Sequence, residues 1–218
     1  IVISAVGDKA FSAGFDIKES IGEPIVDVIP RRENTAMELN TWREVWKCKK
    51  PVIASVQGFC IGGGLHLAFM CDLIIASEDA RFGEPEVAFS YVPDILIEPW
   101  KLPMNKARQL LYLGEYLTAE ELRECGVVNK VVPFEKLEEE TMKIAGRLAE
   151  MPSDTMMMLK YQVNKTYEIQ GMVNAMDFAA EIFSLCRINQ AQTQKEFNEI
   201  VNSQGLKAAL DWKNNHNS

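Results

Sequence analysis

The chain has 218 residues, and 47% of them are hydrophobic, which is enough for the core of one domain with or without a helical extension. The formal net charge is −8 at pH 7, and lysine and arginine are spread along the sequence. A nucleic-acid-binding protein needs a basic face, so this class of protein is disfavoured. No apolar run approaches the ~20 residues of a membrane-spanning helix, so we expect a cytoplasmic protein without membrane contact.

The predicted elements, taken in chain order, change in character at Pro133. Before this residue, short β-rich runs over residues 1–6, 52–56, 72–76 and 127–132 alternate with helical stretches such as residues 33–49. This alternation is typical of βαβ units and a largely parallel sheet. After Pro133 the apolar residues follow a helical period, and we expect helices over residues 135–150, 155–165, 173–188, 195–201 and 206–213.

The cysteines, at positions 48, 60, 71, 125 and 186, lie mostly in apolar runs. Their spacing fits neither a disulfide framework nor a set of metal ligands. The sequence therefore predicts reduced, buried thiols and no metal site.

The most informative segment follows the second predicted strand and contains three consecutive glycines. Residues 57–65 read Gln-Gly-Phe-Cys-Ile-Gly-Gly-Gly-Leu, and the apolar, helix-permissive residues 65–70 complete the pattern. Glycine lets a backbone approach a ligand closely, and the free N–H groups of a helix start favour a phosphate or a forming oxyanion. The Lys-Ser or Lys-Thr pair of a P-loop and the spacing G-x-G-x-x-G are both missing, which disfavours the phosphate. Tight packing of a helix on a sheet remains the structural alternative.

A second turn of similar composition follows the first predicted strand. Residues 11–19 read Phe-Ser-Ala-Gly-Phe-Asp-Ile-Lys-Glu, which indicates a small-residue turn before an acidic helix start. Backbone N–H groups from the two turns could converge on one carbonyl oxygen and form an oxyanion hole. We expect the N–H groups of Phe15 and Gly63 to be these donors.

Three more segments follow these turns, namely Phe-Gly-Glu-Pro-Glu at 82–86, Leu-Thr-Ala-Glu-Glu-Leu at 117–122 and Gly-Val-Val-Asn-Lys-Val-Val-Pro at 126–133. In order and spacing, the five segments resemble the crotonase (enoyl-CoA hydratase/isomerase) superfamily. The resemblance implies an α/β fold, in which a crotonase-like spiral of ββα units over residues 1–133 precedes a helical oligomerisation region over residues 134–218. It also implies a homotrimer or a dimer of trimers. The N-terminal strands of the family have no counterpart, so we expect the natural chain to begin earlier.

The activity implied by the resemblance is the stabilisation of a thioester enolate of an acyl-CoA substrate, without a cofactor beyond the coenzyme A of the substrate itself. In hydratases and isomerases of this family, the glutamate that matches Glu86 is the main proton-transfer residue. A solvated glutamate or an acid favoured by a helix dipole is the alternative for Glu86. Substrate-binding positions are expected at Ala13, Asp16, Ile17, Phe59, Gly62 and Pro93.

Two further candidate catalytic residues have open alternatives. Asp94 lies where some members of the family place a working aspartate, although a Pro-Asp pair often forms a turn whose carboxylate caps the next helix. Hydratases have a glutamate in place of His66, and that glutamate helps to hold the attacking water. The imidazole of His66 could act as a base at neutral pH, or it could be a satisfied histidine of the core. Residues 95–100 are bulkier than in many hydratases and should reshape the acyl pocket.

These observations rank the possible activities. A two-glutamate addition of water cannot operate as in the well-known hydratases when position 66 is histidine, so isomerase-type proton transfer by Glu86 is favoured over hydration. The alternatives are hydrolysis of a β-dicarbonyl C–C bond or of a thioester, with water activated by His66, and a non-catalytic binding role. Neither nucleic acid nor a membrane is an expected partner.

Overall fold

The computed structural model describes residues 1–16, 27–189, 192–205, 207–209 and 211–212. Its strands are β1 (Val2–Ser4), β2 (Ala10–Ser12), β3 (Ile53–Val56), β4 (Phe59–Ile61), β5 (Leu73–Ser77), β6 (Arg81–Gly83), β7 (Leu117–Thr118) and β8 (Lys130–Val132). Its helices include α2 (Val28–Lys47), α3 (Gly63–Met70), the 3-10 helix η1 (Pro85–Phe89), α4 (Glu98–Lys101), α5 (Met104–Leu113), α6 (Ala119–Glu124), η2 (Phe134–Lys136), α7 (Leu137–Ala149), α8 (Ser153–Ile169), α9 (Met172–Asn189) and α10 (Gln192–Gln204). In the last predicted helix, residues 207–209 and 211–212 are helical, and its other residues lie outside the described ranges.

The described strands form two four-stranded sheets. The first has the order β1-β3-β5-β8, and every neighbouring pair in it is parallel. These strands correspond to the four predicted ones, so the prediction of a parallel sheet is confirmed. The second sheet has the order β2-β4-β6-β7, with β2, β4 and β6 parallel and β7 antiparallel to β6. The sequence did not predict it, because strands of two or three residues are too short to show a period.

The two glycine-containing turns follow strands of the second sheet, not strands of the first sheet as predicted. The turn at residues 13–15 follows β2 and not the first predicted strand, and the triple glycine follows β4 and not β3. Residues 17–19 of the predicted acidic helix start lie outside the described residues. Because β2, β4 and β6 are parallel neighbours, their carboxyl ends meet at one edge of the sheet.

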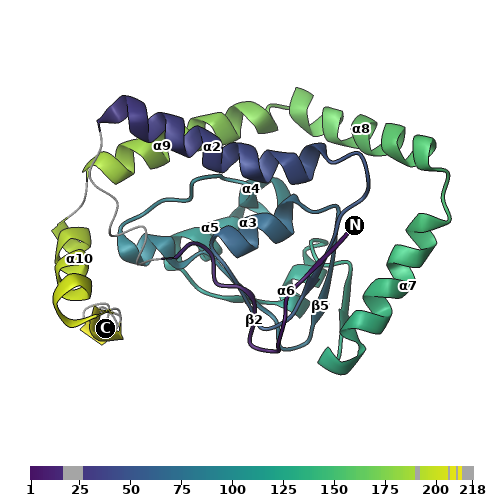
Figure 1. The fold of residues 1–218 in the computed structure, drawn as a ribbon, viewed down its shortest axis with the longest axis horizontal. Coiled ribbons are helices and arrows are strands. Elements are labelled where there is room, and N and C mark those ends of the chain that lie inside the picture. Colours follow the sequence, from purple (N-terminus) through teal and green to yellow (C-terminus); the bar gives the residue numbers. More distant parts are fainter. Residues whose placement is uncertain (17–26, 190–191, 206, 210, 213–218) are drawn as a thin grey trace.

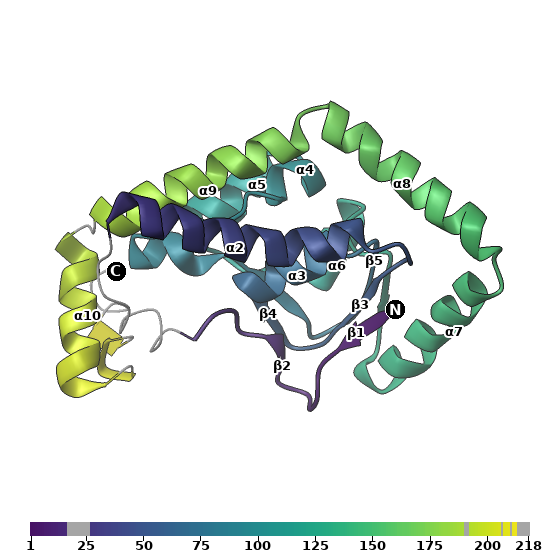
Figure 2. The same cartoon turned by 45° about the horizontal axis from the view of Figure 1, so that its top comes forward.

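The long helices surround the sheets (Figure 1, Figure 2). α2 lies beside α9 in both views, and the Arg43 guanidinium of α2 pairs with the Asp177 carboxylate of α9 at 2.6 Å. α7 packs on the first sheet, where Leu137 closes a small apolar cluster with Ile53 and Ile75. Of these two C-terminal helices, α7 therefore covers the first sheet, whereas α9 packs on α2.

The main core lies between the sheets and the helices. All four residues of β3 are buried, and so are all residues of α3 except Leu67, as expected for a helix that is apolar on every side. All five cysteines are free, and those at positions 60 and 71 are fully buried. Of the described helices, none combines the length and the hydropathy that crossing a membrane requires.

The packing of α3 against β2 gives a test of the fold. A methyl group added at Gly64 would lie 2.7 Å from the carbonyl oxygen of Ser12, whereas one added at Gly146 of α7 would meet open space. Both glycines are helical, so alanine brings the same gain in helix propensity at each. We expect Gly64→Ala to lower the free energy of unfolding by about 1–3 kcal/mol. Gly146→Ala should raise it by up to about 1 kcal/mol. Urea denaturation measures both, and equal values would contradict the close approach of α3 to β2.

Candidate functional site

Three turns meet at the carboxyl edge of the second sheet. A Cβ atom at Gly14, after β2, would lie 3.2 Å from the backbone nitrogen of Gly63, after β4. A Cβ atom at Gly62 would lie only 2.3 Å from Oε1 of Glu86, which belongs to η1 after β6. Gly62 also has a φ of 53°, a conformation that residues with side chains resist. The glycine turn thus makes room for the carboxyl group of Glu86 against the backbone.

Two backbone donors are available beside this carboxyl group. α3 begins at Gly63, and the first N–H groups of a helix have no partner within it. In the part of the chain that the structure describes, neither the N–H of Gly63 nor that of Phe15 donates a hydrogen bond. The ring of Phe15 is 53% exposed and packs edge-on against Trp42, with centroids 6.0 Å apart.

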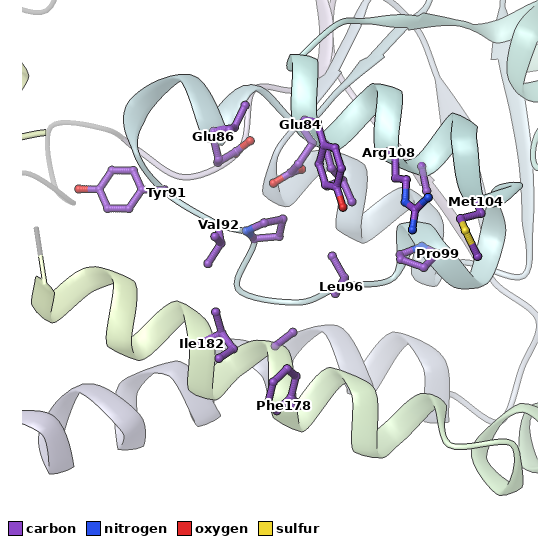
Figure 3. Close-up of a pocket in the computed structure, with 16 residues that line it drawn as sticks. Glu84, Glu86, Tyr91, Val92, Leu96, Pro99, Met104, Arg108, Phe178 and Ile182 are labelled. Atoms are coloured by element: carbon purple, nitrogen blue, oxygen red, sulfur yellow. The ribbon is translucent and has the colours of Figure 1, made fainter. Parts of the chain in front are cut away.

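A mainly apolar cavity of about 560 Å³ adjoins the turns (Figure 3). Glu84 and Glu86 lie on one wall, and Phe178 and Ile182 of α9 form the opposite wall. The full lining consists of Glu84, Glu86, Val87, Tyr91, Val92, Pro93, Leu96, Pro99, Met104, Ala107, Arg108, Leu111, Tyr112, Phe178, Ala179 and Ile182. Such a surface suits an apolar group that presents its reactive end to the two carboxyl groups.

The two carboxyl groups on the cavity wall influence each other. Burial raises the pKa of Glu86, and the negative charge of Glu84 and a hydrogen bond between the two groups raise it further, to about 9. Glu86 is therefore protonated at neutral pH and can donate a proton.

Behind the cavity wall, His66 of α3 is enclosed by three carboxyl groups. Its Nδ1 lies 3.0 Å from Oδ1 of Asp94, and its Nε2 lies 3.3 Å from Oε2 of Glu84 and 3.3 Å from Oε1 of Glu98. All four side chains are at least 95% buried. The indole Nε1 of Trp42, on α2, donates a hydrogen bond of 2.9 Å to the second oxygen of Asp94.

The charges of this cluster follow from its contacts. Burial alone would lower the pKa of His66, but the charges of Glu84 and Asp94 outweigh it and raise the pKa well above the ordinary value. Burial alone would raise the pKa of Asp94, but the contacts with His66 and Trp42 lower it. Burial raises the pKa of Glu98. An imidazolium paired with the carboxylate of Asp94 therefore lies at the centre of the cluster.

The same cluster is the one place in the described residues where side chains could hold a metal ion. One ligand atom each from His66, Glu84 and Glu98 lie within 4.8 Å of one another. Imidazole and carboxylate ligands suit a divalent transition metal. The absence of a metal site stays a prediction.

The predicted site residues fall into three groups. Glu86 and Pro93 line the cavity, and Gly62 touches Glu86. His66 and Asp94 lie behind the wall, and Asp94 does not cap the next helix, since α4 has no side-chain cap. Ala13, Asp16 and Phe59 are exposed and are not among the residues that line the cavity, and Ile17 lies outside the described residues.

Two acidic residues of the site were not among the predicted ones. Glu84 lies within the segment 82–86, of which only Glu86 was predicted as a site residue. Glu98 lies in the bulky stretch 95–100. No spacing in the sequence connects either of them with His66. The proximity of these two acids to His66 is visible only in the folded chain.

Comparisons with known proteins agree on one family. The family model described as enoyl-CoA hydratase/isomerase matches residues 1–207. A probable mitochondrial enoyl-CoA hydratase of Dictyostelium discoideum is 40% identical over 173 residues, which are 77% of this chain and 60% of that protein. A crotonyl-CoA hydratase of Syntrophomonas wolfei is 35% identical over 202 residues, 89% of this chain and 74% of that protein.

A solved structure extends the likeness to the fold. The crystal structure of an enoyl-CoA hydratase/isomerase from Xanthobacter autotrophicus has a TM-score of 0.94 at 32% identity, covering 99% of this chain and 80% of that one. The chain spans 60% of the Dictyostelium protein and 65% of a probable enoyl-CoA hydratase of Rhizobium meliloti.

The charge of His66 can be measured directly. Because its pKa is raised well above the ordinary value, its ring should still be protonated at about pH 7.5, where an unperturbed imidazole is mostly neutral. The stabilisation from this charge is fully present below the unfolded pKa of ~6.5 and is lost as the pH rises through the folded pKa. NMR titration of the ring, assigned with a His66→Asn variant, measures the folded pKa. Asp94→Asn should lower it, and a wild-type midpoint at or below ~6.5 would contradict the imidazolium.

Proposed function

Because the chain belongs to the enoyl-CoA hydratase/isomerase family, we propose that it acts on an enoyl-CoA thioester through an enolate intermediate. The crotonase-like fold expected from the sequence is confirmed, which gives the proposal its structural frame. In the proposed site, the thioester oxygen accepts hydrogen bonds from the N–H groups of Phe15 and Gly63. Both donors are available, since neither has a partner among the described residues.

One observation supports this proposal above the others: the carboxyl group of Glu86 lies directly on the glycine turn that carries the proposed donor of Gly63. A thioester oxygen bound at Gly63 would bring its α-carbon close to Glu86, and the apolar cavity would take the acyl chain. Holding the reacting carbon beside a proton-transfer group is what turns a binding site into a catalytic one.

Glu86 is the proposed proton-transfer residue. In its ionised form, the carboxylate of Glu86 can take a proton from the α-carbon of a 3-enoyl thioester and return one to the γ-carbon of the resulting dienolate, so isomerisation of a double bond needs Glu86 and the oxyanion donors only. Addition of water is the second candidate, and the names of the relatives favour it. Both reactions share the enolate and the protonation step at the α-carbon.

The other predicted activities have less support. Hydrolysis by His66 would need an imidazole that faces the substrate, but both ring nitrogens face buried carboxyl groups. A binding role without catalysis would not explain why the carboxyl group of Glu86 lies against Gly62. Assembly into trimers or dimers of trimers and a cytoplasmic location remain predictions.

The role of Glu86 has a direct test. Glu86→Gln keeps the shape and the hydrogen-bonding capacity of the side chain but removes the transferable proton, so turnover should fall by about 10²–10⁴-fold. The assay incubates the protein with 2-enoyl- and 3-enoyl-CoA in D₂O and follows deuterium incorporation by mass. Glu78→Gln, an exposed acid before β6, is the matched control and should retain activity. Deuterium uptake by Glu86→Gln at the wild-type rate would exclude Glu86 from proton transfer.

The oxyanion donor at Gly63 can be tested by a pair of variants. Alanine and proline both add atoms near the rings of Phe15 and Trp42, which lie 3.3 Å from the position of the new Cβ, but only proline removes the N–H. Proline is tolerated at the first residue of a helix. We expect turnover of Gly63→Pro to be about 10²–10³-fold below that of Gly63→Ala. Thermal melting checks that both fold, and equal turnover of the two folded variants would rule out the donor.

A further inference from the structure

We propose that Glu84 is a second catalytic residue, which takes a proton from a water molecule as that water adds to the β-carbon of the enoyl group. This inference rests on the proposed function, because it uses the same enolate and the same proton donor, Glu86. It adds Glu84 as the base that activates water, and it favours hydration as the reaction.

The first support is the placement of the two carboxyl groups. Glu84 and Glu86 are separated by Pro85 alone, and both line the cavity on the same wall (Figure 3). They are close enough to share a hydrogen bond, and the charge of Glu84 raises the pKa of Glu86. Two acids on one cavity whose environments differ are what an acid–base pair requires.

The second support is the distribution of partners around Glu84. Its Oε2 faces Nε2 of His66 at 3.3 Å. No N–H or hydroxyl group of the described residues donates a hydrogen bond to its Oε1, although the side chain is 98% buried. A buried carboxylate oxygen without such a donor, in a residue that lines a cavity, can be satisfied by a water molecule.

The third support is the chain of contacts behind Glu84. Trp42 holds Asp94, Asp94 pairs with Nδ1 of His66, and Nε2 of His66 pairs with Glu84. Each member is buried, so the imidazole has little freedom to turn. His66 is therefore a positioning residue, which fixes one oxygen of Glu84 and leaves the other without an N–H or hydroxyl donor among the described residues.

In the proposed step, one water molecule adds across the C=C bond of the enoyl group. The water oxygen forms a bond to the β-carbon, its proton passes to Glu84, and the electron pair of the C=C bond moves into the enolate. The enolate then takes the proton of Glu86 at the α-carbon, which completes the addition of one water molecule. Glu84 now carries an extra proton and Glu86 lacks one, and transfer through the hydrogen bond between them restores the starting state.

With Glu84 as the base, addition of water does not need a glutamate at position 66. The sequence disfavoured hydration because the second carboxylate was expected at that position. In the structure, the histidine at position 66 lies behind Glu84, which follows β6 and lines the cavity.

The test separates the addition of water from proton transfer at the α-carbon. Wild type, Glu84→Gln and Glu86→Gln are incubated with 2-enoyl-CoA in H₂¹⁸O, to follow water addition. The same proteins are incubated with 3-enoyl-CoA in D₂O, to follow deuterium exchange at the α-carbon. We expect Glu84→Gln to lose at least about 100-fold in water addition but to exchange deuterium within about 5-fold of wild type, whereas Glu86→Gln loses both. Glu78→Gln is again the control.

The outcomes are distinguishable. If Glu84→Gln adds water at the wild-type rate, or loses both reactions equally while still folded, Glu84 is not the base. If wild type exchanges deuterium but adds no water, this inference fails and the proposed function stands. If wild type does neither with any enoyl-CoA, the proposed function fails as well.

A second set of measurements examines His66 and the possible metal. Asp94→Asn leaves the imidazole in place and should slow water addition at least about 10-fold with little change in KM or deuterium exchange, which a general loss of structure would not produce. Dialysis against EDTA should leave water addition unchanged. Loss of activity on dialysis and recovery with Zn²⁺ would overturn the role of Glu84 as base, because Glu84 would then be a metal ligand.

Discussion

The parallel alignment of β2, β4 and β6 is the constraint on which the site depends. Each strand has only three residues, yet together they bring three turns to one edge of the second sheet. Those turns supply Phe15, Gly63 and the pair Glu84 and Glu86. If the pairing slipped by one residue, every side chain on that strand would change face, and these groups would no longer meet.

Within that edge, the closest contact is between Glu86 and the backbone of Gly62. The carboxyl oxygen occupies the space that a Cβ atom would need, 2.3 Å from where that atom would lie. Glycine is therefore required at position 62 for two reasons: its φ is 53°, and the carboxyl group of Glu86 leaves no room for a Cβ atom. This contact connects the proposed donor at Gly63 with the proposed proton-transfer group, and it fixes their separation without any side chain in between.

The buried charges behind the cavity are tolerated because they are paired. Moving a single charged group into a protein interior costs several kcal/mol unless a partner compensates it. His66 has Asp94 on one side and Glu84 and Glu98 on the other, and Asp94 is held by Trp42. Three of these residues come from positions that the sequence marked as unusual: the histidine after the triple glycine, the candidate Asp94, and Glu98 in the bulky stretch 95–100. The structure shows that these three features form one cluster.

How much the sequence could determine differs from residue to residue. The parallel first sheet, the helical C-terminal half and the glycine turn before α3 follow from periodicity and composition, since these are local properties of the chain. Family membership followed from the order of five short segments, and with it the expectation that Glu86 transfers protons. The contacts of Glu84, Glu98 and Trp42 did not follow, because they join residues 18 to 52 positions apart through strands too short to leave a pattern. Only the tertiary structure could decide which acid faces the cavity and which supports the histidine, because burial and distance are set by packing and not by order along the chain.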